Sequence, residues 1–198
     1  NLYYTGYFDA ATSFRHALFQ TVSIASTTGF ASSDFNLWPD FSRYVLLLLM
    51  FVGGCSGSTA GGMKVSRFVI LLKVTWAELR RTIHPRLVYS IKMGGRNVPP
   101  VVVGNVTRFF YLYMIVFSTL TLLISLTGLS MLDSMGIIAA CMSSVGPAFG
   151  IVGPTATYAD VSTFGRLVVI AAMILGRLEI FTLLIIMRPD FWRVKRNW

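Results

Sequence analysis

The sequence has few of the side chains that enzymes and metal sites use most. Eight of its 198 residues are Asp or Glu, two are His and two are Cys. Cys55 and Cys141 stand in glycine-rich or apolar surroundings, unlike a disulfide framework or a metal-ligand cluster. The apolar segments hold neither a Ser/His/Asp set nor paired carboxylates, the groups of nucleophilic and acid–base catalysis. We therefore predict that the protein is not an enzyme and has no cofactor.

Charge of either sign is also scarce. Charged residues make up 13% of the chain and hydrophobic residues 55%, whereas roughly a quarter of a soluble domain is charged. Apolar runs cover residues 112–126 and 167–187, and about 20 helical residues cross a hydrocarbon core of about 30 Å. These runs predict an integral membrane protein that crosses the bilayer more than once.

The charges that are present are mostly basic and unevenly placed. Nine Lys or Arg residues and a single acid, Glu78, lie between Lys64 and Arg108. Basic loops remain in the cytoplasm, so we expect the connector 81–103 and the tail 191–198 to lie there. The net charge of +9 is then explained by an anionic lipid leaflet, and nucleic acid is not expected as a partner.

Two parts of the chain resemble each other in the order of their features. Residues 14–30 match residues 131–147 at an offset of 117, each an apolar segment that ends in a Ser/Thr turn before Gly29 or Gly146. After an outer loop that is six residues longer in the second copy, "FSRYVLLLLMFVGG" (41–54) matches "FGRLVVIAAMILGR" (164–177) at five of fourteen positions. Both copies run the same way through the membrane, which counts against the inverted repeats of many transporters.

Each copy predicts a short re-entrant helix, a polar turn, an outer loop and a long inner helix. In the first copy (1–80) we expect a pore helix at about 9–25, a turn at 26–30 and a broken inner helix at about 40–80. In the second copy (104–190) we expect an outer helix at about 104–127, a pore helix at about 132–143, a turn at 144–147 and an inner helix at about 163–187.

The short helices end where a helical backbone is not expected to continue. Non-helical backbone is tolerated at membrane depth only where protein or a water-filled cavity satisfies its polar groups. The C-terminal end of a helix carries about half a negative charge, which favours a cation. Rings of carbonyl oxygens can replace the hydration shell of an alkali ion. The alternative is a re-entrant turn packed in protein, whose hydroxyl groups cap the local backbone.

The first inner helix is interrupted by a glycine-rich loop (residues 53–62). Each interior glycine costs about 1 kcal/mol of helix stability relative to alanine, so we expect the helix to unwind here. A phosphate-binding P-loop is excluded because Val65 stands where Ser or Thr would bind magnesium. A tight helix–helix contact through small residues is an alternative, but we favour an intramembrane loop that obstructs the pore. Its expected gating residues are Gly53, Gly54, Gly57, Ser58, Thr59, Gly61 and Gly62.

Arg177 and Glu179 are charges inside the second inner helix. Such a charge costs several kcal/mol unless it is paired or faces water, which makes it a functional candidate. Arg177 aligns with Gly54 at the depth of the glycine-rich loop. It is expected to donate hydrogen bonds to loop carbonyls or to place a positive charge beside the ion path, whereas Glu179 is expected to be structural.

The motifs "HALFQTVSIASTTGF", "LLLLMFVGGCSGSTAGGMKV", "ELRRTIHPR", "SSVGPAFG" and "LGRLEIFTLL" resemble the Trk/Ktr superfamily of potassium uptake proteins, and most closely the bacterial Trk-type transmembrane subunit. The resemblance implies a helical fold of four helix–pore loop–helix units around a pseudo-fourfold pore, with this chain as the third unit, without its first helix, and the complete fourth. It also implies that potassium is bound by the filter backbone of Thr27, Thr28, Gly29, Phe30, Ser144, Val145, Gly146 and Pro147, and that Arg177 belongs to the gate.

The resemblance further implies potassium uptake across a bacterial inner membrane. The implied partners are the N-terminal half of the same polypeptide, a second copy in a homodimer, and a cytoplasmic regulatory subunit that binds nucleotides (TrkA/KtrA-like). A proton- or sodium-coupled symporter with alternating access is the alternative function. It requires titratable residues along the path, and Glu179 is the only carboxylate deep in an apolar run.

Overall fold

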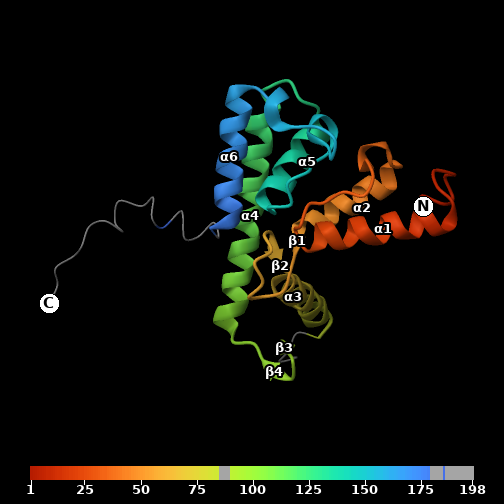
Figure 1. Cartoon of the computed structure of the whole chain (residues 1–198). Helices are drawn as coiled ribbons and strands as arrows, with labels where there is room; N and C mark the ends of the chain where they lie inside the picture. The colour runs from red at the N-terminus through yellow and green to blue at the C-terminus, as the bar shows by residue number, and fades with distance from the viewer. Residues whose placement is uncertain (85–89, 179–184, 186–198) are drawn as a thin grey trace.

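The structure is a computed structural model that describes residues 1–84, 90–178 and 185. Most of these residues are helical, and α4 stands upright with α5 and α6 beside its upper part, while α1 and α2 lie side by side (Figure 1). Among the described residues the helices are α1 (Ala10–Ala25), α2 (Asp40–Phe51), α3 (Val65–Ile83), α4 (Pro100–Ser125), α5 (Met131–Met142) and α6 (Thr163–Arg177).

Helix α5 lies at the centre of the packing. It contacts α2, α4 and α6, and every residue from Ile137 to Met142 is at most 1% exposed. A helix that is apolar on all sides must be surrounded by protein or lipid. Its 12 residues span only about 18 Å, so α5 is too short to cross a hydrocarbon core.

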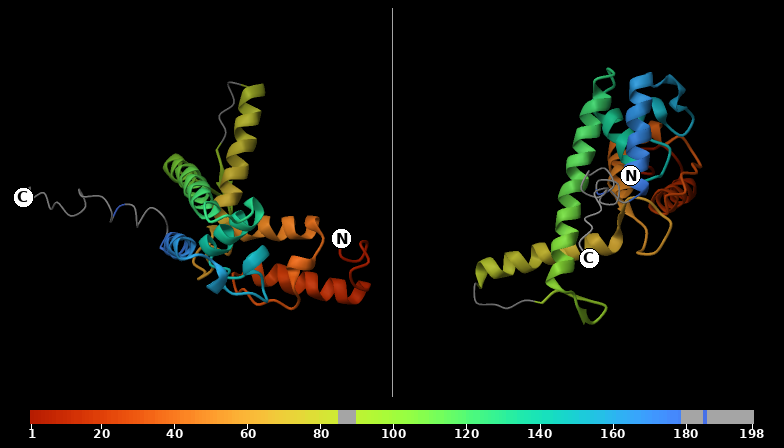
Figure 2. Two further views of the ribbon diagram at one scale, coloured as in Figure 1. Left: turned by 90° about the horizontal axis from the view of Figure 1, so that it is seen from above. Right: turned by 90° about the vertical axis from the view of Figure 1, so that its left-hand side faces the viewer.

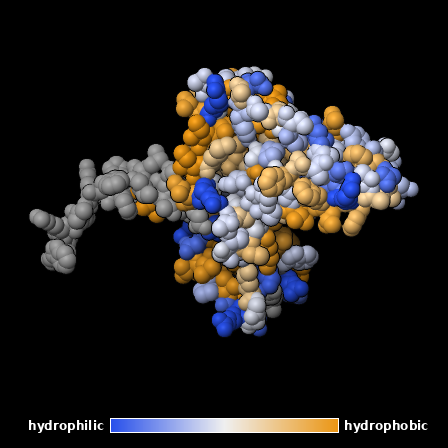
Figure 3. All heavy atoms as spheres, viewed as in Figure 1, coloured by the Kyte–Doolittle hydropathy of each residue, from blue (hydrophilic) through white to orange (hydrophobic). Residues whose placement is uncertain are grey.

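Of the described helices, α4 alone is both long and apolar enough to cross a membrane. Its 26 residues extend about 39 Å. It begins at Pro100, four residues before the expected position, because proline is well tolerated at the first position of a helix. Apolar side chains also line the exposed flank of α6 (Figure 3), including Leu167, Ile170 and Ile174. The expected end of that inner helix lies outside the described residues.

The first inner helix is broken, as its glycine content indicates. Helix α2 ends at Phe51, and α3 begins at Val65 and runs across the lower end of α4 (Figure 2). Between them, β1 (Val52–Gly53) pairs in parallel with β2 (Met63–Lys64). A small-residue contact between continuous helices is therefore wrong for this segment.

Two short β-ladders, this pair and a second one, interrupt the mostly helical structure without changing its class. The unwound backbone at the helix break needs hydrogen-bond partners, which the β1–β2 ladder supplies. In the connector, β3 (Lys92–Met93) and β4 (Arg96–Asn97) form an antiparallel hairpin. Its two turn residues, Gly94 and Gly95, both have positive φ, as tight hairpin turns require.

The outer loops repeat at an offset of 123 residues. Each contains a short 3-10 turn, η1 (Phe35–Leu37) in the first copy and η3 (Tyr158–Asp160) in the second. A further turn, η2 (Gly150–Val152), lies in the longer second loop. The helices that follow, α2 and α6, begin at the same offset, Asp40 and Thr163. The sequence repeat is therefore also a repeat of backbone structure.

Candidate ion-conduction site

The segments after α1 and α5, the first turn (residues 26–30) and the second turn (residues 143–147), have the same backbone hydrogen bonds at the same offset of 117. Each helix ends in a Schellman motif, in which the last carbonyls accept from N–H groups beyond the helix end. In the first turn the bonds are Thr27 N–H to Ile24 O and Thr28 N–H to Ser23 O; in the second they are Ser144 N–H to Cys141 O and Val145 N–H to Ala140 O.

Both turns also place a residue other than glycine in the left-handed region. Thr27 has φ of 55° and Ser144 has φ of 57°, a conformation that a β-branched residue such as threonine rarely adopts. Two residues later Gly29 has φ of 78° and Gly146 has φ of 104°. For a residue other than glycine, such as Thr27 or Ser144, the left-handed conformation costs about 1–3 kcal/mol, and strain of this kind is often found at functional sites.

The two turns lie against each other. A Cβ atom on Gly29 would overlap the backbone oxygen of Val145 and would lie 3.1 Å from Cδ of Pro147. The structure therefore brings the two predicted filter segments together, although they are far apart in the sequence. Thr28 and Phe30 are exposed, while Val145 is buried.

Two of the eight carbonyls implied as potassium ligands are bonded to side chains of the protein. The hydroxyl of Ser23 donates to the Phe30 carbonyl at 2.6 Å, and the hydroxyl of Tyr158 donates to the Gly146 carbonyl at 2.7 Å. Some local capping also occurs, since Ser26 Oγ donates to the Val22 carbonyl. Tyr158 was not expected from the sequence, where nothing distinguishes it from the other aromatic residues.

The glycine-rich loop contacts both turns through Gly61. The N–H of this buried residue donates to Oγ1 of Thr27 at 3.2 Å. On its other side, a Cβ on Gly61 would overlap the backbone oxygen of Ser143. Only a residue without a side chain fits between the two turns in this way.

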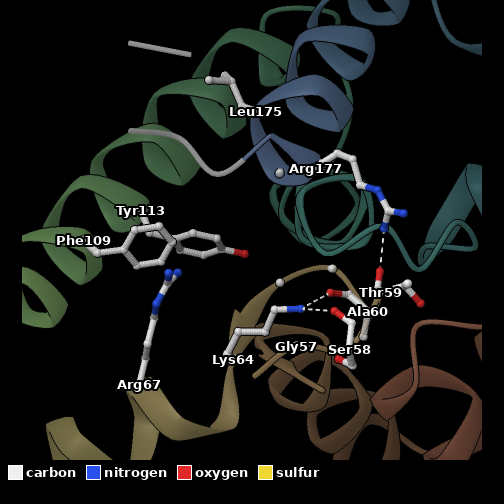
Figure 4. Close-up of a pocket in the computed structure, with 13 residues that line it drawn as sticks. Gly57, Ser58, Thr59, Ala60, Lys64, Arg67, Phe109, Tyr113, Leu175 and Arg177 are labelled. Atoms are coloured by element: carbon white, nitrogen blue, oxygen red, sulfur yellow. Dashed lines mark hydrogen bonds between the residues drawn. The ribbon is translucent and has the colours of Figure 1, made fainter. Parts of the chain in front are cut away.

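Two positively charged side chains, Lys64 and Arg177, bind carbonyls of the loop (Figure 4). Lys64 Nζ donates to the carbonyls of Ser58, at 2.9 Å, and Ala60. Arg177 Nη1 donates to the carbonyl between them, that of Thr59, at 2.6 Å. Hydrogen bonds from charged donors are the stronger kind. The contact of Arg177 with a loop carbonyl was expected, whereas Lys64 was not.

A cavity of about 320 Å³ lies beside the loop, lined by residues of α3, α4, α6 and the loop itself. Arg67 of α3 stacks on the ring of Phe109 in α4, with 4.0 Å between its guanidinium carbon and the ring centroid. Lys64 and Arg177 line the same cavity. Glu179, the other charge singled out in the second inner helix, lies outside the described residues.

The outer loops of the two copies are joined by Asn36, which the sequence analysis did not identify. Its side-chain amide donates to the Gly150 carbonyl at 3.1 Å and accepts from the Gly150 N–H at 3.0 Å. The neighbouring rings of Phe35 and Phe149 meet edge to face, with 5.4 Å between their centroids. These contacts connect residues 114 apart in the sequence and join the two outer loops.

We expect Asn36→Ala to destabilise the protein without changing its ion preference. The substitution removes both hydrogen bonds and leaves the partly buried polar groups of Gly150 without their partner, at a cost of about 1–3 kcal/mol. Thermal denaturation of the full-length protein in detergent measures the loss. Asn36→Asp, which keeps the acceptor and loses the donor, should be intermediate, and equal stability of all three proteins would contradict the prediction.

Apolar helices that end in paired turns, together with one longer helix that is apolar enough to cross a membrane, are features of a helical membrane protein. A model of the family TrkH, described as cation transport protein, matches residues 3–193. The chain therefore belongs to the TrkH family of cation transport proteins.

Individual relatives agree with this assignment. The Trk system potassium uptake protein TrkH of Vibrio parahaemolyticus is 45% identical over 190 residues, which cover 96% of this chain and 38% of that protein. TrkH of Escherichia coli is 40% identical over 187 residues, which cover 94% and 38%. The crystal structure of the potassium transporter TrkH from V. parahaemolyticus matches with a TM-score of 0.88 and 43% identity, over 97% of this chain and 41% of that one. The chain thus spans about two fifths of the length of these relatives.

Proposed function

We propose that this chain carries two of the pore segments of a potassium uptake protein, and that potassium passes beside the first and second turns. The observation that carries the proposal is the repeated turn geometry. Two turns with the same Schellman hydrogen bonds and the same pair of positive φ angles meet at Gly29 and Val145. The relatives from V. parahaemolyticus and E. coli are potassium uptake proteins by name.

The chemistry at the turns suits a monovalent cation. Helices α1 and α5 both end at the turns, and each helix end contributes about half a negative charge. Among the described residues no hydrogen bond reaches the carbonyl oxygens of Thr27, Thr28 and Ser144. These oxygens are the proposed potassium ligands, because carbonyls replace the hydration shell of potassium. The Phe30 and Gly146 carbonyls are bonded to side chains, and we propose that they shape the filter instead.

We further propose that the glycine-rich loop is the gate. It contacts both turns through Gly61, and Lys64 and Arg177 hold three successive carbonyls of it. A loop held by a few polar contacts rather than by a packed apolar core belongs to the less stable parts of a protein, from which moving elements are drawn. Withdrawal of the loop would open the path on the cytoplasmic side.

The remaining parts of the proposal concern the whole protein. Two pore segments do not close a four-sided ring, and the relatives are much longer than this chain. We propose that the other two segments come from the same polypeptide, that the protein lies in a bacterial inner membrane as a homodimer, and that its basic connector faces a cytoplasmic regulatory subunit.

Ion currents test this function directly. The full-length protein is reconstituted in liposomes, and the reversal potential is recorded under a potassium gradient. Reversal at the potassium equilibrium potential, unchanged when sodium or pH is varied, is the expected result. A reversal potential that shifts with the proton or sodium gradient would show coupled symport and contradict the channel-like mechanism.

A further inference from the structure

Each turn has one of its carbonyls bonded to a side-chain hydroxyl, but the two hydroxyls come from different places. In the first copy the donor is Ser23 of α1, which bonds the Phe30 carbonyl. At the offset of 117 the second copy has Ala140 in place of Ser23, so α5 offers no hydroxyl there. The second copy instead receives its hydroxyl from the outer loop, through Tyr158 and the Gly146 carbonyl.

The hydroxyl of Tyr158 is an addition specific to the second copy. At the offset of 123, Tyr158 corresponds to Phe35, and both residues begin a 3-10 turn that precedes the inner helix. Each turn has the same internal bond, Trp38 N–H to Phe35 O in the first and Val161 N–H to Tyr158 O in the second. The ring is therefore a common feature of the two loops, and the phenolic oxygen is the difference between them.

The orientation of the Gly146 peptide depends on the bond from Tyr158, because packing confines this peptide less than it confines the Gly29 peptide. A Cβ on Gly29 would overlap Val145, so the neighbouring backbone confines the peptide there, whereas no atom of the described residues lies within 4 Å of a Cβ built on Gly146. Glycine has more backbone freedom than any other residue. Among the described residues, the Tyr158 hydroxyl is therefore the contact that determines which way the Gly146 carbonyl points.

Tyr158 is suited to this task because its own position is well defined. Its loop is held by the 3-10 turn, which Thr157 caps by accepting from the Ala159 N–H, and its hydroxyl also lies 3.3 Å from Cys141 Sγ at the end of α5. Burial raises the pKa of the Tyr158 phenol. The phenol therefore stays protonated and remains a donor.

We propose that Tyr158 is a positioning residue for ion selectivity, which holds the Gly146 carbonyl toward the outer loop and away from the ion path. The inference rests on the proposed function, because it assigns Tyr158 to the same filter. Without the hydroxyl, the Gly146 peptide can rotate and present an extra oxygen to the path. An additional, mobile oxygen allows the filter to close around an ion smaller than potassium, so sodium is discriminated less well.

The test compares Tyr158→Phe with the unsubstituted full-length protein in liposomes. Phenylalanine is the residue that the first copy has at this position, so the ring and its packing are kept. We expect the potassium-to-sodium permeability ratio to fall about two- to tenfold, the factor that corresponds to one net hydrogen bond. Cys141→Ala is the matched control, because it removes the other contact of the hydroxyl and keeps the bond to Gly146; its ratio should be unchanged.

The outcomes separate this inference from the function on which it rests. If the unsubstituted protein shows no preference for potassium, the proposed function itself fails. If the unsubstituted protein is selective and Tyr158→Phe, with an unchanged melting temperature, is equally selective, the role of Tyr158 is overturned. A lower ratio in Cys141→Ala equal to that in Tyr158→Phe would also overturn it, because general loosening of the loop would then account for both.

Discussion

Potassium selectivity is expected to be lost when Gly29 is replaced with alanine. The new Cβ would overlap the Val145 carbonyl oxygen, and that neighbour is backbone, which no change of rotamer can move aside. The φ angle of 78° adds about 1–2 kcal/mol of strain for any residue with a Cβ. One of the two turns must therefore shift. We expect the potassium-to-sodium permeability ratio, measured from reversal potentials in liposomes, to fall by about tenfold or more, since about 1.4 kcal/mol corresponds to a factor of ten.

Gly128→Ala provides a matched control for backbone strain. Gly128 lies between α4 and α5 with φ of 82°, close to that of Gly29, and no atom in the described part of the chain lies within 4 Å of its built Cβ. Its substitution should cost similar strain and leave the permeability ratio unchanged. Normal selectivity in a folded Gly29→Ala protein would remove the first turn from the filter. A loss of selectivity in Gly128→Ala would show that strain anywhere in the chain has the same effect.

The second large effect is expected at Arg177. Arg177→Ala removes the hydrogen bond from α6 to the Thr59 carbonyl and leaves the loop held by Lys64 and Gly61. A hydrogen bond from a charged donor is worth about 1.5–3 kcal/mol, and the lower end applies because Arg177 is exposed. We therefore expect the rate of potassium uptake to rise about tenfold, as followed by tracer uptake into liposomes. An unchanged or reduced rate would contradict a closing role for this contact.

Two further variants separate the contact from the charge. Arg177→Lys keeps the positive charge beside the path but changes the length and geometry of the donor. If the hydrogen bond closes the pore, the lysine variant should also be faster, whereas an electrostatic barrier predicts a normal rate. Arg166→Ala is the control on the same helix, because Arg166 donates to Thr163 at the far end of α6; its rate should be unchanged.

The positions of the turns and of the helix break followed from composition and the repeat. Short apolar segments that end in Ser, Thr and Gly predicted where α1 and α5 stop, and five closely spaced glycines predicted where α2 stops. These features are local, so propensity and periodicity detect them. The resemblance to a family of potassium uptake proteins is confirmed at the level of the family by the match over residues 3–193.

The contacts that hold the site together were not predictable in the same way. Asn36 bonds a residue 114 positions away, and the hydroxyl of Tyr158 reaches back over an outer loop of the second copy to Gly146. Such contacts depend on how loops fold back, for which a single sequence has no periodic signal. The contacts of Lys64 were also not predictable. Lys64 lies in β2, and its bonds to the glycine-rich loop depend on how the loop folds back beside the β1–β2 pair, which helical spacing does not indicate.

The position of Gly61 between the two turns has a thermodynamic consequence. Its N–H donates to Thr27 Oγ1, and a Cβ added to it would overlap the Ser143 backbone oxygen. In the gating that we propose, withdrawal of the loop therefore releases both turns at once. Binding of ions at the turns and withdrawal of the glycine-rich loop are then linked equilibria, and linkage is reciprocal. Ions that bind more tightly after withdrawal should promote it, so the fraction of time spent conducting should depend on the permeant ion itself.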